Sequence, residues 1–270
     1  MGARAMKCSC VPSALHLGAF AFLLGGCMGS PGAFGPDGYR PSGSPLIVRY
    51  AEPAEHRFVS ADWRVDNFVV ADDGTIGKPK QTDAYVQPRE IDVDDDGVVD
   101  INSKAFVYDL KLVNRVTDGA IWLQTVPLAM RDKDRSLPSI LDDFVESLSG
   151  TGVYRVTTIQ PHRLAATKTY AAHVLSATGG RTGGFESIDA TIELVNLDQL
   201  KVDPNAKSEI GRIVVVRTNY PLEITDTANH KFVGLAMVVV GCDSHPRDFD
   251  ATNADFVKFL AALDFASPPR

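Results

Sequence analysis

The sequence predicts an α+β fold, in which a mostly antiparallel β-sheet packs with two amphipathic helices in a sandwich-like arrangement. Three observations lead to this prediction. Strand-like segments follow one another with hairpin signals between them, and helical periodicity of apolar residues appears once mid-chain and once at the end. Residues 211–220 and 231–241 contain near-continuous apolar runs, which are typical of central strands covered on both faces. Adjacent strands with helices packed on them form this class of domain.

The N-terminus has the pattern of a secretory leader. Arg4 and Lys7 precede a short apolar run at 17–24, and small residues follow it. The tetrad Leu24-Gly25-Gly26-Cys27 resembles the lipobox of bacterial lipoproteins. That resemblance implies a signal peptide over 1–26, cleavage before Cys27, and attachment of acyl chains such as palmitate to Cys27. The alternative is an ordinary secretory leader with an accidental cysteine.

Lipidation at Cys27 would decide where the protein resides. Each buried methylene group contributes about 0.8 kcal/mol, so two or three acyl chains hold a protein on a membrane durably. We therefore predict a membrane-anchored, extracytoplasmic lipoprotein, at the periplasmic face of the outer membrane or at the cell surface.

The cysteine count follows from the same interpretation. Of the four cysteines, Cys8 and Cys10 leave with the leader and Cys27 is lipidated, so only Cys242 remains. The sequence therefore predicts a fold without an intramolecular disulfide.

The charge balance excludes one class of partner. Removal of Arg4 and Lys7 with the leader takes the formal net charge from −7 to −9. An acidic chain without a basic stripe is a poor candidate for binding nucleic acid. It is equally poorly suited to lying flat on anionic lipid.

A linker is expected after the lipidated cysteine. Residues 29–45 are rich in Gly, Pro and Ser, and such a composition buries too little apolar surface to offset its chain entropy. We expect a flexible tether over 27–45 and a single globular α+β domain over 46–270. The domain has about 220 residues, enough to bury most of its apolar surface without disulfides.

The first strands of this domain are expected over 63–70 and 105–115, where β-branched and aromatic residues alternate with polar ones. Asp118-Gly119 separates the second of these from the apolar segment 121–126. Asp-Gly between apolar runs indicates a hairpin.

Residues 136–150 predict the first amphipathic helix. Ser136 is suited to the N-cap, and Gly150 can end the helix. The apolar residues fall at the i, i+3, i+4, i+7 spacing of one stripe. They are Leu137, Ile140, Leu141, Phe144, Val145 and Leu148.

The second half of the chain contains further strands and the second helix. Strands are expected over 152–159, 169–177, 185–197, 211–220 and 231–241. Residues 177–185 are Gly-rich but lack the Lys-Ser/Thr of a phosphate loop, so they predict a flexible hairpin tip. The last helix is expected to follow Thr252, with Asp255 completing a capping-box-like start. Its stripe consists of Phe256, Phe259, Leu260 and Leu263.

This order of elements resembles the Mog1/PsbP-like sandwich. The resemblance covers residues 105–265 and rests on one helix after the first hairpin, a run of long strands, and a terminal amphipathic helix closing on Phe265. Members of that family mostly bind partner proteins rather than catalyse reactions, and bacterial lipoproteins occur among them. No binding residues carry over, because no binding motif of the family matches.

The acidic stretch 92–101, DVDDDGVVDI, is the strongest hint of chemistry in the sequence. Its spacing resembles the D-x-[DN]-x-[DN]-G calcium loop of EF-hand, dockerin and integrin-type repeat proteins. The resemblance implies carboxylate ligands, a sharp turn at Gly97 and a carbonyl ligand at Val98. Ser103 stands where an EF-hand has its bidentate Glu, so an integrin-type loop between strands fits better. The predicted calcium ligands are Asp92, Asp94, Asp96, Val98 and Asp100.

The alternative is an acidic hairpin turn that binds no metal. Asp96-Gly97 would supply the turn, and the apolar residues on either side would pack inward. Both interpretations stay open, and either makes the segment structural rather than catalytic.

Catalytic motifs are weak by comparison. Cys242 and His245 could suggest a thiol nucleophile with a base, but a Cys after an apolar run is more often a small buried residue at a strand end. We therefore predict a non-enzymatic binding or structural module of the cell envelope, with a protein partner and calcium as a candidate cofactor. The alternative is a cell-envelope hydrolase whose active site is assembled from residues distant in sequence.

Overall fold

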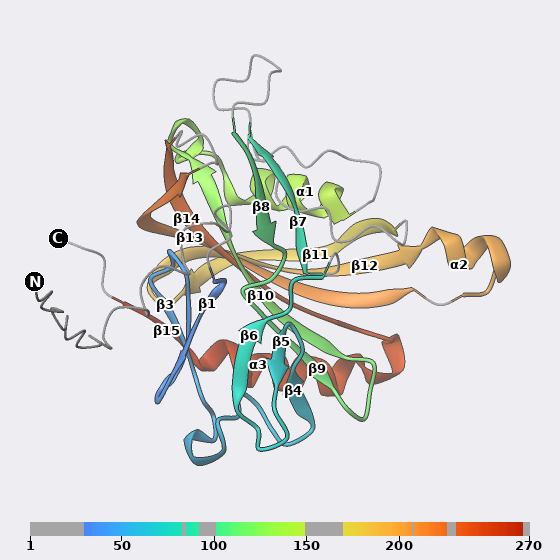
Figure 1. Cartoon of the computed structure of the whole chain (residues 1–270). Helices are drawn as coiled ribbons and strands as arrows, with labels where there is room; N and C mark the ends of the chain where they lie inside the picture. The colour runs from blue at the N-terminus through green and yellow to red at the C-terminus, as the bar shows by residue number, and fades with distance from the viewer. Residues whose placement is uncertain are drawn as a thin grey trace, which may run out of the picture.

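The structure, a computed structural model of the chain, describes residues 30–82, 85–91, 101–148, 170–206, 208–225 and 231–266. Its centre is a seven-stranded antiparallel sheet with the strand order β11-β12-β13-β14-β10-β9-β4 (Figure 1). In this order the strands are β11 Tyr170–Thr182, β12 Phe185–Asn196, β13 Glu209–Thr225, β14 Lys231–Ser244, β10 Ala120–Ala129, β9 Leu110–Asn114 and β4 Trp63–Val65. The sheet-rich α+β prediction is therefore confirmed.

The two central strands are buried on both faces, as their apolar runs predict. Alternate side chains of a strand point to opposite faces, so consecutive apolar residues supply two cores. One core contains Val214, Val216, Val238 and Val240, and the other contains Ile213, Val215, Met237 and Val239.

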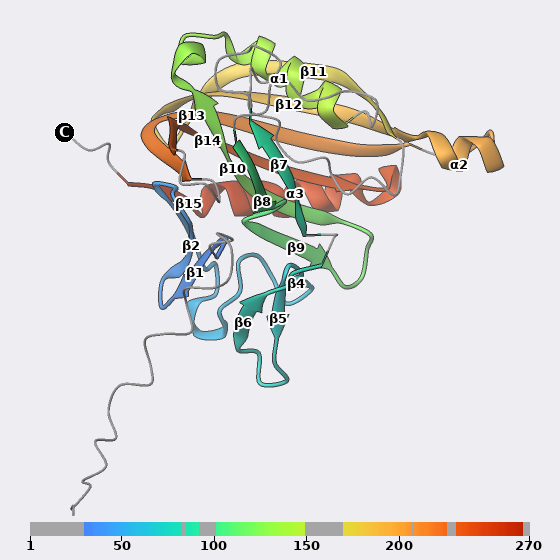
Figure 2. The ribbon, with the colours of Figure 1, turned by 45° about the horizontal axis from the view of Figure 1, so that its top comes forward.

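Helices α1 (Leu137–Leu148) and α3 (Phe249–Ala261) cover opposite faces of the sheet (Figures 1 and 2). The predicted stripe of α1 packs on the sheet through Leu137, Ile140, Leu141, Phe144 and Val145. The Phe144 ring is stacked 6.1 Å from that of Trp122. Ser136 accepts a hydrogen bond from the Ser139 amide, as an N-cap residue does.

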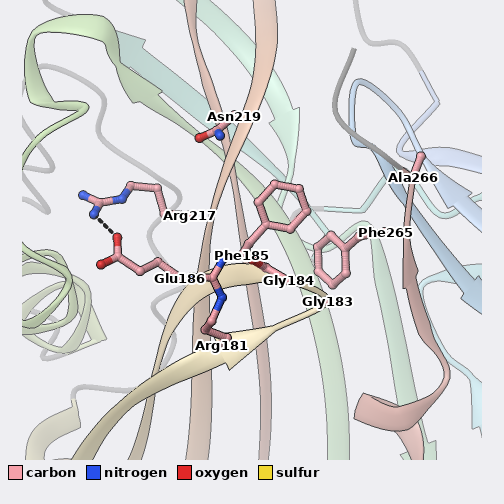
Figure 3. Close-up of a pocket in the computed structure, with 9 residues that line it drawn as sticks. All are labelled: Arg181, Gly183, Gly184, Phe185, Glu186, Arg217, Asn219, Phe265 and Ala266. Atoms are coloured by element: carbon pink, nitrogen blue, oxygen red, sulfur yellow. Dashed lines mark hydrogen bonds and ion pairs between the residues drawn. The ribbon is translucent and has the colours of Figure 1, made fainter. Parts of the chain in front are cut away.

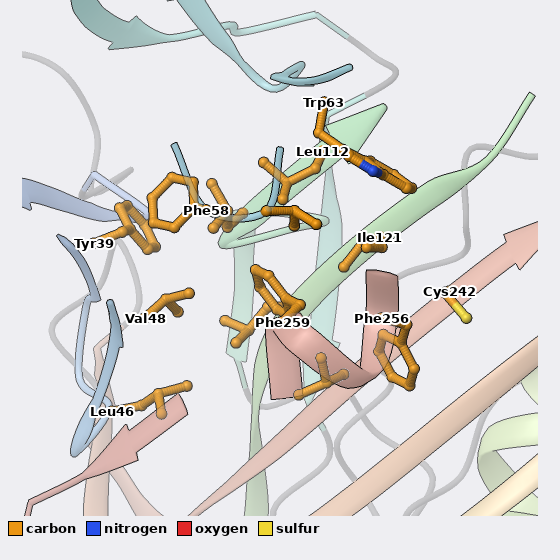
Figure 4. Packing of buried hydrophobic residues seen from close by; sticks show 14 of the residues in the cluster. Tyr39, Leu46, Val48, Phe58, Trp63, Leu112, Ile121, Cys242, Phe256 and Phe259 are labelled. Carbon is orange, nitrogen blue, oxygen red and sulfur yellow. The ribbon is translucent and has the colours of Figure 1, made fainter. Parts of the chain in front are cut away.

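The terminal helix starts earlier than predicted. The 3₁₀ turn Pro246–Asp248 leads directly into α3, and Thr252 is buried inside the helix rather than at its N-cap. Phe256 and Phe259 are fully buried against the sheet, as expected of the stripe (Figure 4). A third, short α-helix, α2 (Leu197–Val202), follows β12, so the prediction of two helices is wrong in number.

The tether predicted over 27–45 is wrong for the part that the structure describes. Residues from Gly32 onward form a four-stranded sheet, and Tyr39 within it is fully buried. The Tyr39 hydroxyl donates a hydrogen bond to the Asp109 carbonyl at 2.7 Å, and Gly32 lets that ring approach because a Cβ there would lie 2.4 Å from the hydroxyl oxygen. The glycines serve close packing rather than disorder. The strands are β1 Gly32–Gly35, β2 Gly38–Pro41, β3 Leu46–Arg49 and β15 Leu263–Phe265.

Two predicted strands are each split in two. Residues 63–70 form β4 and β5 (Phe68–Val70), and residues 105–115 contain the end of β8 (Ile101–Phe106) and then β9. Asn67 causes the first break, because its buried side chain bonds the backbone of the neighbouring strand segment. Two small antiparallel pairs complete the fold: β5 with β6 (Ile76–Pro79), and β7 (Val86–Ile91) with β8.

The predicted hairpins and later strands are mostly confirmed. The β9–β10 hairpin encloses Asp118-Gly119, and β11 to β14 are all present. β11, β13 and β14 are longer than expected, whereas β12 ends one residue earlier than expected. The strand predicted over 152–159 lies outside the described residues. Two further 3₁₀ turns span Pro53–Glu55 and Met130–Asp132. No helix in the described ranges has the length and apolarity needed to span a membrane.

Candidate functional site

The residues predicted as sites from the sequence lie outside the described residues. These are Cys27 and the calcium-loop residues Asp92, Asp94, Asp96, Val98 and Asp100. The segments that flank the loop are strands β7 and β8, which pair in register up to Ile91 opposite Ile101. Because both flanking segments are strands, the segment 92–100 connects two strands and is not the loop of a helix–loop–helix pair. Calcium binding stays a prediction, as does its alternative of a plain acidic turn.

Elsewhere, the described ranges hold no group of three or more His, Cys, Asp or Glu side chains arranged to bind a metal ion. Cys242 is a free thiol, 1% exposed, in the core under α3. Burial, followed by the nearby Asp243 carboxylate, raises the pKa of the Cys242 thiol to about 12. The His245 ring accepts a hydrogen bond from the Arg247 amide at the start of the 3₁₀ turn. Cys242 is therefore a protonated core residue and not an activated nucleophile.

A pocket of about 520 Å³ lies at the tip of the β11–β12 hairpin, where β13 and the end of β15 pass beside it (Figure 3). Three segments distant in sequence build it: residues 181–186, 217–219 and 265–266. Its lining residues are Arg181, Gly183, Gly184, Phe185, Glu186, Arg217, Asn219, Phe265 and Ala266.

The charged side of the pocket is a row of three side chains across three adjacent strands. Arg181 of β11 lies directly opposite Glu186 of β12, and Glu186 lies directly opposite Arg217 of β13. Residues that are directly opposite on neighbouring strands share a face, with Cβ atoms about 4.5–5.5 Å apart. The row therefore places one acidic residue between two arginines, and the acidic side chain pairs with Arg217.

Arg217 is the fixed member of this row. Its guanidinium donates to the Lys133 carbonyl at 3.1 Å and to the Arg135 carbonyl, and it pairs with the Glu186 carboxylate. The Arg217 side chain is only 18% exposed, whereas the Glu186 side chain is 61% exposed. Arg181 is exposed and donates to the Gly184 carbonyl across the turn.

The apolar side of the pocket is aromatic. The ring centroids of Phe185 and Phe265 lie 5.5 Å apart, and Phe185 also contacts Tyr220 at 6.1 Å. Tyr220 donates a hydrogen bond to the Ala266 carbonyl, which ties β13 to the residue after β15. Gly183 has a φ of +56°, and a Cβ on it would lie 2.2 Å from the Phe265 ring, so only glycine fits the turn.

Sequence reasoning finds the hairpin tip but not the pocket. The tip predicted over 177–185 is confirmed only at the turn Gly183-Gly184, because residues 177–182 belong to β11. The strand register brings Arg217 beside Glu186, and β15 brings Phe265 to Phe185. The Arg-x-Gly-Gly-Phe-Glu sequence, with its charges and aromatic ring around a tight turn, is the local signal that could have drawn attention to it.

A second polar cluster lies where the residues just after β4, just after β6 and just before β7 meet β9. The Tyr85 hydroxyl donates a hydrogen bond to the Asp66 carboxylate, and the ammonium groups of Lys80 and Lys111 lie 5.8 and 5.9 Å from the Tyr85 ring centroid. Burial and the Asp66 carboxylate raise the pKa of the Tyr85 phenol well above its usual range, so the phenol keeps its proton. We interpret this cluster as a tie between the small strand pairs and the main sheet.

Comparisons with known proteins show a weak likeness of fold. No family model matches the chain, and no curated protein matches it either. Among solved structures, the chain is similar to the solution structure of cyanobacterial PsbP (CyanoP) from Synechocystis sp. PCC 6803, with a TM-score of 0.38 and 8% identity, over 67% of this chain and 93% of that chain. This is a weak PsbP-like resemblance of fold, and no binding or activity follows from it.

Proposed function

We propose that this chain is a membrane-anchored, extracytoplasmic lipoprotein that acts as a non-enzymatic binding module of the cell envelope. The lipobox-like tetrad ending at Cys27 supports the anchor, and the pocket at the β11–β12 tip supports the binding role. In this proposal a segment of a partner protein occupies the pocket, and the lipid anchor keeps the module at the membrane.

The observation that carries the binding role is the construction of the pocket. Its aromatic floor and its charged row come from β11, β12, β13 and β15, so the protein backbone holds both without a ligand. Rigid aromatic side chains beside a few polar groups are typical of recognition sites, because little conformational entropy is lost when a ligand binds.

Site-specific photo-crosslinking in the producing host tests this role. Replacing the exposed Asn219 with a photo-reactive phenylalanine analogue places the probe in the lining of the pocket. The same replacement at exposed Asn205, just after α2, is the control. The two positions lie near opposite ends of β12. This strand has 12 residues and is therefore roughly 40 Å long at 3.3 Å per residue.

We expect one discrete protein adduct from position 219, no such adduct from position 205, and loss of the adduct when Phe185→Ala is added. Equal crosslinking patterns from both positions, or a pattern indifferent to Phe185→Ala, would contradict the binding role of the pocket.

A further inference from the structure

The row Arg181–Glu186–Arg217 carries an excess of positive charge on an otherwise acidic protein. It holds two guanidinium groups and one carboxylate, whereas the whole chain has a formal net charge of −7. Among the described residues, the hydrogen bond of Arg181 goes to the Gly184 carbonyl and Arg181 has no carboxylate partner. Within the described part of the chain, Arg181 is therefore a cation without a counter-charge.

The single carboxylate of the row is the part that can move. Glu186 is mostly exposed, and its contact within the described chain is the ion pair with Arg217. Because the Glu186 carboxylate lies mostly in solvent, water can replace its contact with Arg217 at little cost. Arg217 stays in position without it, because the Lys133 and Arg135 carbonyls hold the guanidinium.

The remaining wall of the pocket suits an extended peptide with an aromatic side chain. Phe185 and Phe265 are half-buried and offer ring surfaces on which another aromatic group can pack. β12 pairs with β13 no further than Arg217, so in the described part of the chain no strand lies along that edge of β13 at Asn219. An open strand edge of this kind can accept an extended segment.

We propose that the pocket recognises an acidic side chain next to an aromatic residue in a segment of the partner protein. The ligand's Asp or Glu carboxylate displaces Glu186 from Arg217 and is held between Arg217 and Arg181, while its aromatic neighbour packs on Phe185 and Phe265. Glu186 is thus an internal competitor that occupies the cation site when no ligand is present. This inference rests on the proposed binding function and adds the chemistry of the ligand.

The test is a titration of the full chain in detergent with short peptides, followed by saturation-transfer difference NMR. The probes are N-acetyl-Phe-Glu-amide and its uncharged match, N-acetyl-Phe-Gln-amide. N-acetyl-Gln-Phe with a free carboxylate tests the other source of a carboxylate, a chain terminus. The variants are Glu186→Gln and Arg181→Gln, with Arg64→Gln on the exposed face of β4, at the opposite edge of the sheet, as the control.

We expect the Phe-Glu peptide to bind more tightly than the Phe-Gln peptide. Glu186→Gln should lower its Kd about threefold to fivefold, the equivalent of removing one exposed ion pair. Arg181→Gln should raise its Kd by a similar factor, and Arg64→Gln should leave it unchanged. An increase in affinity is decisive for the competitor role, because a misfolded variant cannot bind more tightly.

Three results would overturn the inference: equal binding of the Glu and Gln peptides, binding of the terminal carboxylate alone, or weaker binding by Glu186→Gln. If any of these occurs while the crosslink at position 219 persists, the binding function stands and only the ligand chemistry is wrong. If the crosslink is absent as well, the proposed function fails with it.

Discussion

A single buried polar side chain, that of Asn67, accounts for the break between two strands of this protein. Asn67 is 2% exposed and sits between β4 and β5, where its amide group donates to the carbonyls of Tyr108 and Asp109 and accepts from the Lys111 amide. A pattern of apolar and polar residues does not contain this information, because an Asn in an alternating run is indistinguishable from a solvent-facing one. The sequence therefore predicts one strand over 63–70 where the structure has two.

Asn67→Ala should destabilise the protein by about 2–4 kcal/mol, because it leaves buried backbone groups without partners. Urea unfolding of the full chain measures this, with Asn205→Ala at an exposed turn as the matched control, expected within about 0.5 kcal/mol of the wild type. A loss of similar size in both variants would show that Asn67 does not hold the break.

Cys242 makes the free energy of unfolding depend on pH in the alkaline range. Its pKa is about 12 in the folded chain, against an ordinary value of 9.0, because burial disfavours the thiolate. Between these two values the unfolded chain releases a proton that the folded chain keeps. The contribution of the thiol is therefore complete below pH 9 and is lost as pH rises toward 12, by up to about 1.4 kcal/mol per pH unit.

Cys242→Ala should accordingly lose less stability than the wild type between pH 8 and pH 10.5, whatever its stability at pH 8. Urea unfolding at the two pH values gives the comparison. Parallel losses in the two proteins would mean that the thiol does not titrate in this way.

At the scale of elements, the sequence predicts the strongly periodic helices and strands well, but it predicts the residues at which they begin and end less well. Helix α1 matches its predicted stripe and N-cap, and the apolar runs of β13 and β14 are central strands. The predicted start of α3 is wrong, because a 3₁₀ turn leads into the helix and such a turn has no periodic pattern in the sequence. The Gly-rich segment before β3 is folded because its glycines allow close packing, which composition alone cannot separate from disorder.

The buried stripe of α3 offers an internal comparison. Phe259→Ala removes a fully buried ring and should cost about 3–5 kcal/mol. Val257→Ala, on the same helix at 48% exposure, should change the free energy of unfolding by about 0.5 kcal/mol or less. Similar costs at the two positions would contradict the packing of α3 described here.

The loop between β7 and β8 can be tested for calcium directly. If Asp92, Asp94, Asp96 and Asp100 bind calcium in the folded state alone, the full chain gains about 2.7 kcal/mol at a hundredfold excess over Kd. Thermal unfolding with calcium and then with chelator should show this gain, and an Asp94→Ala/Asp96→Ala variant should lose it. No calcium-dependent shift in the wild type would leave the segment as a plain acidic turn.

At the scale of the whole molecule, the pocket depends on contacts that no local pattern contains. Its charged row requires the registers of two strand pairs, and its aromatic floor requires that β15 returns to the N-terminal sheet beside the hairpin tip. The burial of the central strands on both faces, by contrast, could be predicted. A continuous apolar run in a strand places apolar side chains on both faces of the sheet, and both faces must then be covered. Fold class is thus accessible from this sequence, whereas the pocket could be found only from the structure.

The proposed envelope role depends on the proposed lipid anchor at Cys27, because the anchor would decide which proteins the pocket can reach. The most direct measurement is fractionation of the producing cells, comparing the wild type with Cys27→Ala. We predict that the wild type is found with the membranes and that Cys27→Ala moves to the soluble fraction. Membrane retention of Cys27→Ala would contradict the anchor, and with it the account of this chain as a lipid-tethered binding module.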